Sequence, residues 1–314
     1  MSRITHNTKI RSAMSIKRKL VGFTRGYTTV ELLVGLVLSL FIIGLTLTYF
    51  MVSARTLKLH TNEAVVQENG RFALEILASA IRHAGINPSN DLDHQMQVFY
   101  AGSLCASGEQ ALGHGEASTS ACTKDGANNL VDNNSDRVSV DFVLDASKMP
   151  SDMSVSLCNG HRVDVPAGRQ RHFASVYWTA DIDGDGVRSL YCQGLNLDTN
   201  LAEGAASPLI DGVERLQVQY GLDSNGDGIV ERYLSFTHLG ATNAHRVRSV
   251  RFALLVASGL HETEANTEFG GQRKTFKLLD GASETMTNEQ VFRQVYATTV
   301  MIHNAPSPSF TSAP

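Results

Sequence analysis

An uncharged apolar run at residues 32–52 constrains this chain more than any other stretch of its sequence. A helix of that length extends about 31 Å at 1.5 Å per residue, which matches the hydrocarbon core of a bilayer. Residues 1–26 hold seven Lys or Arg and no acid, and the rest of the chain has 20 bases against 31 acids. Basic residues before a spanning helix favour a cytoplasmic N-terminus. We therefore expect a single-pass membrane protein with an acidic body on the far side.

A single acid, Glu31, lies at the start of this run, where a carboxylate is costly. Gly26 is a small residue placed before the apolar run, whereas an ordinary signal peptide is cut after it. Cleavage after Gly26 would create an amine on Tyr27, four residues before Glu31 and on the same helix face. That amine could pair with Glu31 of its own chain or of a neighbouring helix. The alternative interpretation is an interfacial carboxylate that faces lipid headgroups.

The stretch RGYTTVELLVGLVLSL (25–40) resembles the class III signal of type IV pilins and type II secretion pseudopilins. The resemblance implies that a prepilin peptidase cuts after Gly26 and methylates the amine of Tyr27. It also implies that Glu31 neutralises the amine of an adjacent subunit during assembly. This sequence has Tyr27 and Thr-Thr-Val where the family usually has Phe and Thr-Leu-Ile. It also has Thr48 where many major pilins carry a proline, so the helix can continue without a kink.

Helical spacing of apolar residues continues beyond the membrane segment, and Gly85 and Pro88 then supply stop signals. We predict a leader at 1–26, a transmembrane helix at 27–52, an amphipathic stalk helix at 53–85, a β-rich globular domain at 86–304 and a flexible tail at 305–314. Met14 offers an alternative start to Met1, with a shorter basic leader. The stalk residues expected to face the domain are Phe72, Ile76, Leu77, Ala80, Ile81 and Ala84.

Alternating apolar residues in the second half of the chain predict β-strands that pack one face on a core. Such runs cover 138–144, 216–220, 250–256 and 291–302, with a further strand expected at 233–237. Residues 101–135 are rich in Gly, Ser, Ala and Asn without a period, which predicts a long loop. The expected fold class is therefore α+β and pilin-like, with the long N-terminal helix packed on an antiparallel sheet.

The chain has four cysteines, Cys105, Cys122, Cys158 and Cys192, all beyond the apolar run. None forms a CxxC pair, so a zinc site is not expected. An even count in a translocated body favours two disulfides. Three pairings can be drawn, and we favour Cys105–Cys122, which would close a loop, with Cys158–Cys192, where each residue ends a strand-like run. Four free buried thiols are the alternative.

Two acidic loops, DIDGDGVRS from Asp181 and DSNGDGIVE from Asp223, resemble the first half of a calcium loop. Each has oxygen-bearing residues at positions 1, 3 and 5 and Gly at position 6. The candidate ligands are Asp181, Asp183 and Asp185 in the first loop, and Asp223, Asn225, Asp227 and Glu231 in the second. Position 12 lacks the bidentate Glu in both, so neither is an EF-hand. The same residues are also those that tight turns require, and a metal-free hairpin tip is the alternative.

The segment LIDGVERLQVQYGLDSNGDGIVERY (209–233) is similar to the PilW family of minor pilins, as is the ending VFRQVYATTVMIHN (291–304), where His303 replaces an Arg often found there. The resemblance implies a minor pilin that helps to prime pilus assembly and lies at the pilus tip, supporting motility and adhesion. Expected partners are other minor pilins, the major pilin, a PilY-type tip protein, the inner membrane and prepilin peptidase. The body would first lie in the periplasm and later on the cell surface.

Three other functions compete with this interpretation. The chain could be a minor pseudopilin of type II secretion, the counterpart at the tip of a pseudopilus. It could be a membrane-tethered enzyme, but we find no GxSxG, P-loop or GxGxxG motif, and the HETE at His261 lacks the second His of a zinc protease helix. It could also be a tip receptor that binds through the 101–135 loop. No cofactor is required for subunit packing, and the acidic body disfavours direct nucleic-acid binding.

Overall fold

The computed structural model of the protein describes residues 26–86, 123, 125, 135–147, 154–182, 184, 186–199, 201–258, 274–279, 284–286 and 291–305. The chain divides into two units, Met1–Leu57 and Lys58–Pro314. The helix α1 contributes its N-terminal part to the first unit and its C-terminal part to the second. Every described residue of the first unit is exposed.

The helix α1 extends from Thr29 to His83. Thr28 precedes it, and the Thr28 Oγ1 accepts a hydrogen bond from the N–H of Glu31 at 3.3 Å, which is an N-cap contact. After the helix, Gly85 has a φ of 72° and donates its N–H to the carbonyl of Asp141 at 2.8 Å. Glycine adopts this φ without steric cost, so it is suited to ending a helix. Since no proline lies inside it, α1 is continuous, as predicted.

The C-terminal part of α1 buries one face in the second unit. The buried positions are three or four residues apart, which is the spacing of a single helix face. They are Val66, Gly70, Ala73, Leu77, Ala78 and Ile81. Of the residues predicted to face the domain, Leu77, Ile81 and Ala84 are buried, and Ile76 and Ala80 are half-buried against the same core, but Phe72 is 50% exposed. The buried stripe also begins earlier along the helix, at Val66.

The first sheet has the strand order β1-β4-β5-β6, and all of its pairings are antiparallel. Its strands are β1 (Val138–Asp145), β4 (Gln170–Ala180), β5 (Ser189–Asn196) and β6 (Leu201–Asp211). A small hairpin precedes β4, formed by β2 (Val155–Ser156) and β3 (Arg162–Val163). Every residue of β5 is buried, so this strand lies at the centre of the packing.

The second sheet has the strand order β12-β9-β7-β8 and is also antiparallel. Its strands are β7 (Val213–Leu222), β8 (Arg232–Leu234), β9 (Val247–Ala257) and β12 (Arg293–Met301). The helix α2 (Phe236–Leu239) and the 3-10 helix η2 (Ala241–Arg246) link β8 to β9. A separate hairpin pairs β10 (Lys274–Phe276) with β11 (Glu284–Met286).

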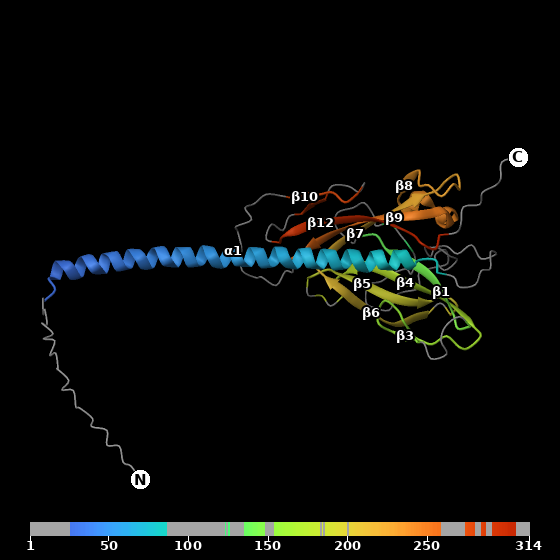
Figure 1. The fold of residues 1–314 in the computed structure, drawn as a ribbon, viewed down its shortest axis with the longest axis horizontal. Coiled ribbons are helices and arrows are strands. Elements are labelled where there is room, and N and C mark those ends of the chain that lie inside the picture. Colours follow the sequence, from blue (N-terminus) through green and yellow to red (C-terminus); the bar gives the residue numbers. More distant parts are fainter. Residues whose placement is uncertain are drawn as a thin grey trace, which may run out of the picture. The chain divides into compact units, whose positions relative to one another are not determined.

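The two sheets and the C-terminal part of α1 share one apolar core (Figure 1). Leu77 and Ile81 of α1 belong to it, with Leu190 from the first sheet and Leu216 and Phe252 from the second. A helix packed on antiparallel sheets is the predicted α+β fold, which is confirmed. The structure adds that the strands form two separate four-stranded sheets within the described residues.

A short segment before β1 joins the two sheets. The N–H of Asp136 donates to the carbonyl of Leu216 at 2.8 Å, and the Asp136 carboxylate accepts the N–H of Val218 at 2.7 Å. The Ser135 hydroxyl accepts the N–H of Leu216 at 2.8 Å. Strand β7 pairs with β8 only from Tyr220 onward, so these contacts satisfy the earlier part of β7. The chain that forms β1 in the first sheet therefore also closes the edge of the second.

Candidate functional site

Gly26 and Tyr27 lie before the first helical residue, and both are exposed. The Tyr27 side chain is 83% exposed, and no atom lies within 4 Å of a Cβ built on Gly26. The peptide bond between these residues is thus outside the helical hydrogen-bond ladder. A peptidase needs an accessible substrate backbone, and this exposed segment lies outside the helix.

Glu31 occupies the third helical position, with Thr28 as the capping residue. The pair Thr28 and Glu31 has the spacing of a capping box, in which Thr and Glu satisfy the free N–H groups of the first turn. A negative charge in this turn also interacts favourably with the helix dipole. The Thr28 hydroxyl therefore caps the N–H of Glu31, and the contact of the Glu31 carboxylate with an amine stays a prediction. The role of Thr28 was not predicted, although the T-x-x-E pattern marks it.

The first unit contains the most apolar part of α1. By length and composition, α1 is the helix that could cross a membrane within the described residues. Its large apolar side chains between positions 30 and 52 are all about half exposed or more. Apolar side chains over that length would be unfavourable in water, so they need lipid or other helices around them.

A disulfide joins Cys158 to Cys192, with the two Cα atoms 6.0 Å apart. Cys192 lies on the buried strand β5, while Cys158 lies in the turn between β2 and β3. The next residue, Asn159, donates its side-chain amide to the carbonyls of Glu203 at 2.7 Å and Ala205 at 2.9 Å. The disulfide and Asn159 together fasten the β2–β3 hairpin to the first sheet. The predicted partner pair, Cys105 and Cys122, lies outside the described residues.

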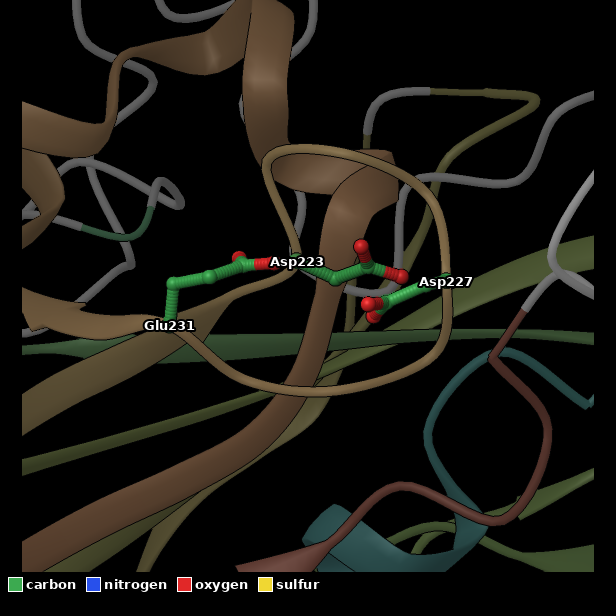
Figure 2. A group of neighbouring side chains, drawn as sticks. All are labelled: Asp223, Asp227 and Glu231. Carbon is green, nitrogen blue, oxygen red and sulfur yellow. The ribbon is translucent and has the colours of Figure 1, made fainter.

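The second acidic loop closes around Asp223, which is fully buried. Its Oδ1 accepts the N–H of Gly226 at 2.6 Å, and its Oδ2 accepts the N–H of Gly228 at 2.9 Å. Asp227 and Glu231 offer carboxylate oxygens that lie within 4.8 Å of each other and of an Asp223 oxygen. Figure 2 shows these two side chains on opposite sides of Asp223. The predicted set is thus brought together, and Asn225 joins it by donating to Asp227 at 3.0 Å.

A guanidinium group also contacts this cluster. Arg248 donates its Nε to the Asp223 Oδ2 at 3.0 Å, and its side chain is only 11% exposed. Burial would raise the pKa of Asp223, but the hydrogen bond from Arg248, followed by those from Gly228 and Gly226, lowers it below its ordinary value. Asp223 thus has its charge paired and both oxygens engaged. Asp223 in this arrangement does not fit the role of a calcium ligand, because a metal would have to compete with Arg248.

The first acidic loop repeats the same local pattern around Asp181. The N–H of Gly184 donates to its Oδ1 at 2.9 Å, and the N–H of Gly186 donates to its Oδ2 at 3.1 Å. The other two candidate ligands, Asp183 and Asp185, lie outside the described residues. Calcium binding at this loop therefore stays a prediction.

Comparisons with known proteins identify the C-terminal half of the body. Residues 176–304 match the family model described as PilW, Type IV Pilus-assembly protein W. Among solved structures, the type IV-like pilin TTHA1219 from Thermus thermophilus is similar, with a TM-score of 0.36, 12% identity, and coverage of 76% of this chain and 98% of that chain. A search of the curated proteins found no match. The resemblance predicted from 209–233 and 291–304 is confirmed, because both segments lie within residues 176–304, which match the PilW family model.

Proposed function

We propose that this chain is a minor pilin that takes part in priming and assembly of a type IV pilus. The proposal rests on one observation: the chain combines the PilW match at 176–304 with the Gly26–Tyr27–Glu31 motif at the start of an apolar helix. The family match supports a role in a pilus. The motif supports processing and assembly by the route that pilins use.

Processing begins at the exposed segment before α1. A prepilin peptidase on the cytoplasmic side of the inner membrane hydrolyses the peptide bond between the Gly26 carbonyl and the Tyr27 nitrogen, and it then methylates the new amine. The basic leader is removed, while the helix remains in the bilayer with the body in the periplasm. Since Thr28 caps the helix by contacting the N–H of Glu31, cleavage before it leaves the first turn intact.

Assembly then moves the apolar helix from lipid to a packed position among neighbouring helices. The carboxylate of Glu31 pairs with the terminal amine of an adjacent subunit, which neutralises two charges in an apolar setting. Partners are other minor pilins, the major pilin and a PilY-type tip protein, with the pilus tip as the final location. The protein acts as an assembly subunit rather than a catalyst, needs no cofactor for packing, and supports motility or adhesion through the pilus.

The first test of this function is the mass of the protein recovered from membranes. The wild type should begin at Tyr27 with a methylated amine, while Gly26→Val should retain the leader and keep its basic residues. Gly35→Val is the control, because no atom lies within 4 Å of a Cβ built there and the residue is away from the cut site. Recovery of a wild-type protein with the leader still attached would refute the proposed processing.

The second test separates processing from assembly. Glu31→Ala and Glu31→Gln should both be cleaved, and both should be recovered in sheared pili at a level reduced roughly tenfold or more, since the loss of one buried ion-pair partner costs about 3–5 kcal/mol. Thr28→Val is the matched variant. It removes the cap but keeps the charge, so it should be incorporated better than either Glu31 variant. Normal incorporation of Glu31→Ala would remove the proposed role of the carboxylate.

A further inference from the structure

The loop at 223–231 is built like a cation-binding loop, yet its described contacts already include a cation. Its three carboxylates, from Asp223, Asp227 and Glu231, lie close together around a buried aspartate (Figure 2). Asp227 and Glu231 are exposed, so water screens their charges, whereas Asp223 is fully buried. A buried carboxylate is costly unless a positive group or hydrogen bonds offset its charge.

Two arginines from the start of β9 and the end of η2 supply positive charge. Arg248 donates from Nε to the Asp223 Oδ2 at 3.0 Å, with only 11% of its side chain exposed. Arg246 donates from Nη1 to the carbonyl of Ser224 at 2.9 Å, and its own carbonyl accepts the N–H of Asp223 at 3.0 Å. The loop is thus anchored to β9 through a charged contact with Arg248 and to η2 through two polar contacts with Arg246.

The remaining acids of the loop are engaged by the loop itself. The Glu231 Oε2 accepts the N–H of Ser224 at 2.7 Å and the Ser224 hydroxyl at 3.0 Å. The Asp227 Oδ1 accepts the N–H of Ile229 at 2.8 Å. These bonds set the loop conformation without an ion. Asp223 at its centre is the carboxylate that is fully buried, and it is the one that Arg248 contacts.

We propose that Arg248 is the resident cation of the 223–231 loop and takes the place that a divalent metal ion holds in loops of this sequence. The loop is then ordered without calcium, and its order depends on a contact 25 residues away along the chain. A guanidinium group suits this role because it is always charged and is more weakly hydrated than an ammonium group or a divalent ion. The proposal is independent of the function in the pilus.

The test measures the melting temperature of the full-length chain in detergent, with EDTA and with millimolar CaCl2. In EDTA, Arg248→Gln should melt about 5–10 °C below the wild type, because it leaves Asp223 buried without a counter-charge. Calcium should raise the melting temperature of Arg248→Gln by about 3–5 °C more than that of the wild type, because the ion can take the place of the missing guanidinium. The additional Asp227→Asn substitution should abolish that extra gain.

Two matched variants make the result specific to this contact. Arg246→Gln removes a cation that contacts the same loop at Ser224 but not at Asp223, so its response to calcium should equal that of the wild type. Arg248→Lys keeps the charge and should remain insensitive to calcium. If Arg248→Gln does not fold, the calcium response of the wild type with and without Asp227→Asn still tests the proposal. The Asp181 loop is present in every variant, so any calcium response from it cancels in these comparisons.

Two results would overturn the proposal. In the first, Arg248→Gln has the melting temperature of the wild type in EDTA and the same response to calcium as the wild type. In the second, the wild type itself gains stability from calcium and loses that gain on Asp227→Asn, which would mean that a metal ion binds this loop despite Arg248.

Discussion

Asp141 is a carboxylate that the fold holds in an unfavourable place. It lies on β1 with 8% of its surface exposed, and its Oδ1 has no hydrogen-bond partner among the described residues. Burial raises the pKa of Asp141 from 3.8 to about 7, and a hydrogen bond from the N–H of Phe142 offsets only part of this shift. The residue therefore prefers to be protonated in the folded protein.

This shift predicts that the body loses stability as pH rises. Between pH 4 and pH 7 the unfolded chain releases the proton of Asp141 while the folded chain keeps it, so ionisation favours the unfolded state. A shift of this size corresponds to about 4 kcal/mol between the two ends of that window. Asp141→Asn should remove this dependence, so that its free energy of unfolding changes less than that of the wild type between mildly acidic and mildly alkaline pH.

Urea unfolding of the full-length chain in detergent at pH values on either side of the window measures this effect. Asp164→Asn is the control, because Asp164 is exposed on the surface of the same domain. The interpretation fails if Asp141→Asn keeps the pH dependence of the wild type, or if Asp164→Asn removes it to the same extent.

At the level of elements, the contact between α1 and β12 depends on a glycine. A Cβ built on Gly70 would fall on the ring of Tyr296, so the helix approaches the strand with no space for a side chain. Asn69, the neighbouring residue, donates its side-chain amide to the carbonyl of Asp211 at 3.0 Å, which fixes the helix along the other sheet. Helix and sheets therefore meet through a close backbone approach as well as through apolar side chains.

We predict that Gly70→Ala destabilises the body by about 1–3 kcal/mol, because overpacking forces the ring of Tyr296 to move. In a Tyr296→Ala background the same substitution should be neutral or stabilising by up to about 1 kcal/mol, since alanine is the better helix former. The sign change in this double-mutant cycle is the readout, measured by chemical unfolding. Equal effects of Gly70→Ala in both backgrounds would show that the ring is not what limits position 70.

Strands whose sequence alternates apolar with more polar residues were predictable, and strands without this alternation were not. The alternating patterns at 138–144, 216–220, 250–256 and 291–302 correspond to β1, β7, β9 and β12. By contrast, β5 is buried at every position and includes Gln193 and Asn196, so polar residues occur at buried positions and no alternation is left to detect. The exposed edge strand β6 also gives no pattern, because its sequence is rich in Ala, Gly and Ser. The strand expected at 233–237 is only partly present, because β8 ends at Leu234 and the chain then turns into α2.

The candidate site divides in the same way between local and distant features. The Gly26–Tyr27–Glu31 motif and the two acidic loops are local in sequence, so their residues could be named before the structure was known. The partner of Asp223 could not, because Arg248 reaches it through the pairing of β7 with β9. Similarly, Asp125 caps α2 by accepting the N–H groups of Phe236 at 2.8 Å and Thr237 at 2.7 Å, more than a hundred residues away. Contacts of this kind depend on how distant segments pack together, so no local pattern in the sequence indicates them.

At the scale of the whole molecule, the stability of the body should not depend on the first unit. Every described residue up to Leu57 is exposed, and the first buried residue of α1 is Val66. A chain that begins at Lys58 would therefore lose no buried side chain, and only its first helical turns would fray.

We predict that such a chain, exported to the periplasm by a cleavable signal peptide, is soluble and folded. Its melting temperature should agree with that of the full-length protein in detergent to within about 2–3 °C, which is the shift expected for a change of less than about 1 kcal/mol in a domain of this size. Circular dichroism and a thermal melt give the comparison, and aggregation or a much lower melting temperature would show that the first unit stabilises the second. The same chain lacks Gly26 and Glu31, so it should be absent from sheared pili. Its presence there would mean that the body alone directs assembly, and that the apolar helix serves only to hold the subunit in the membrane.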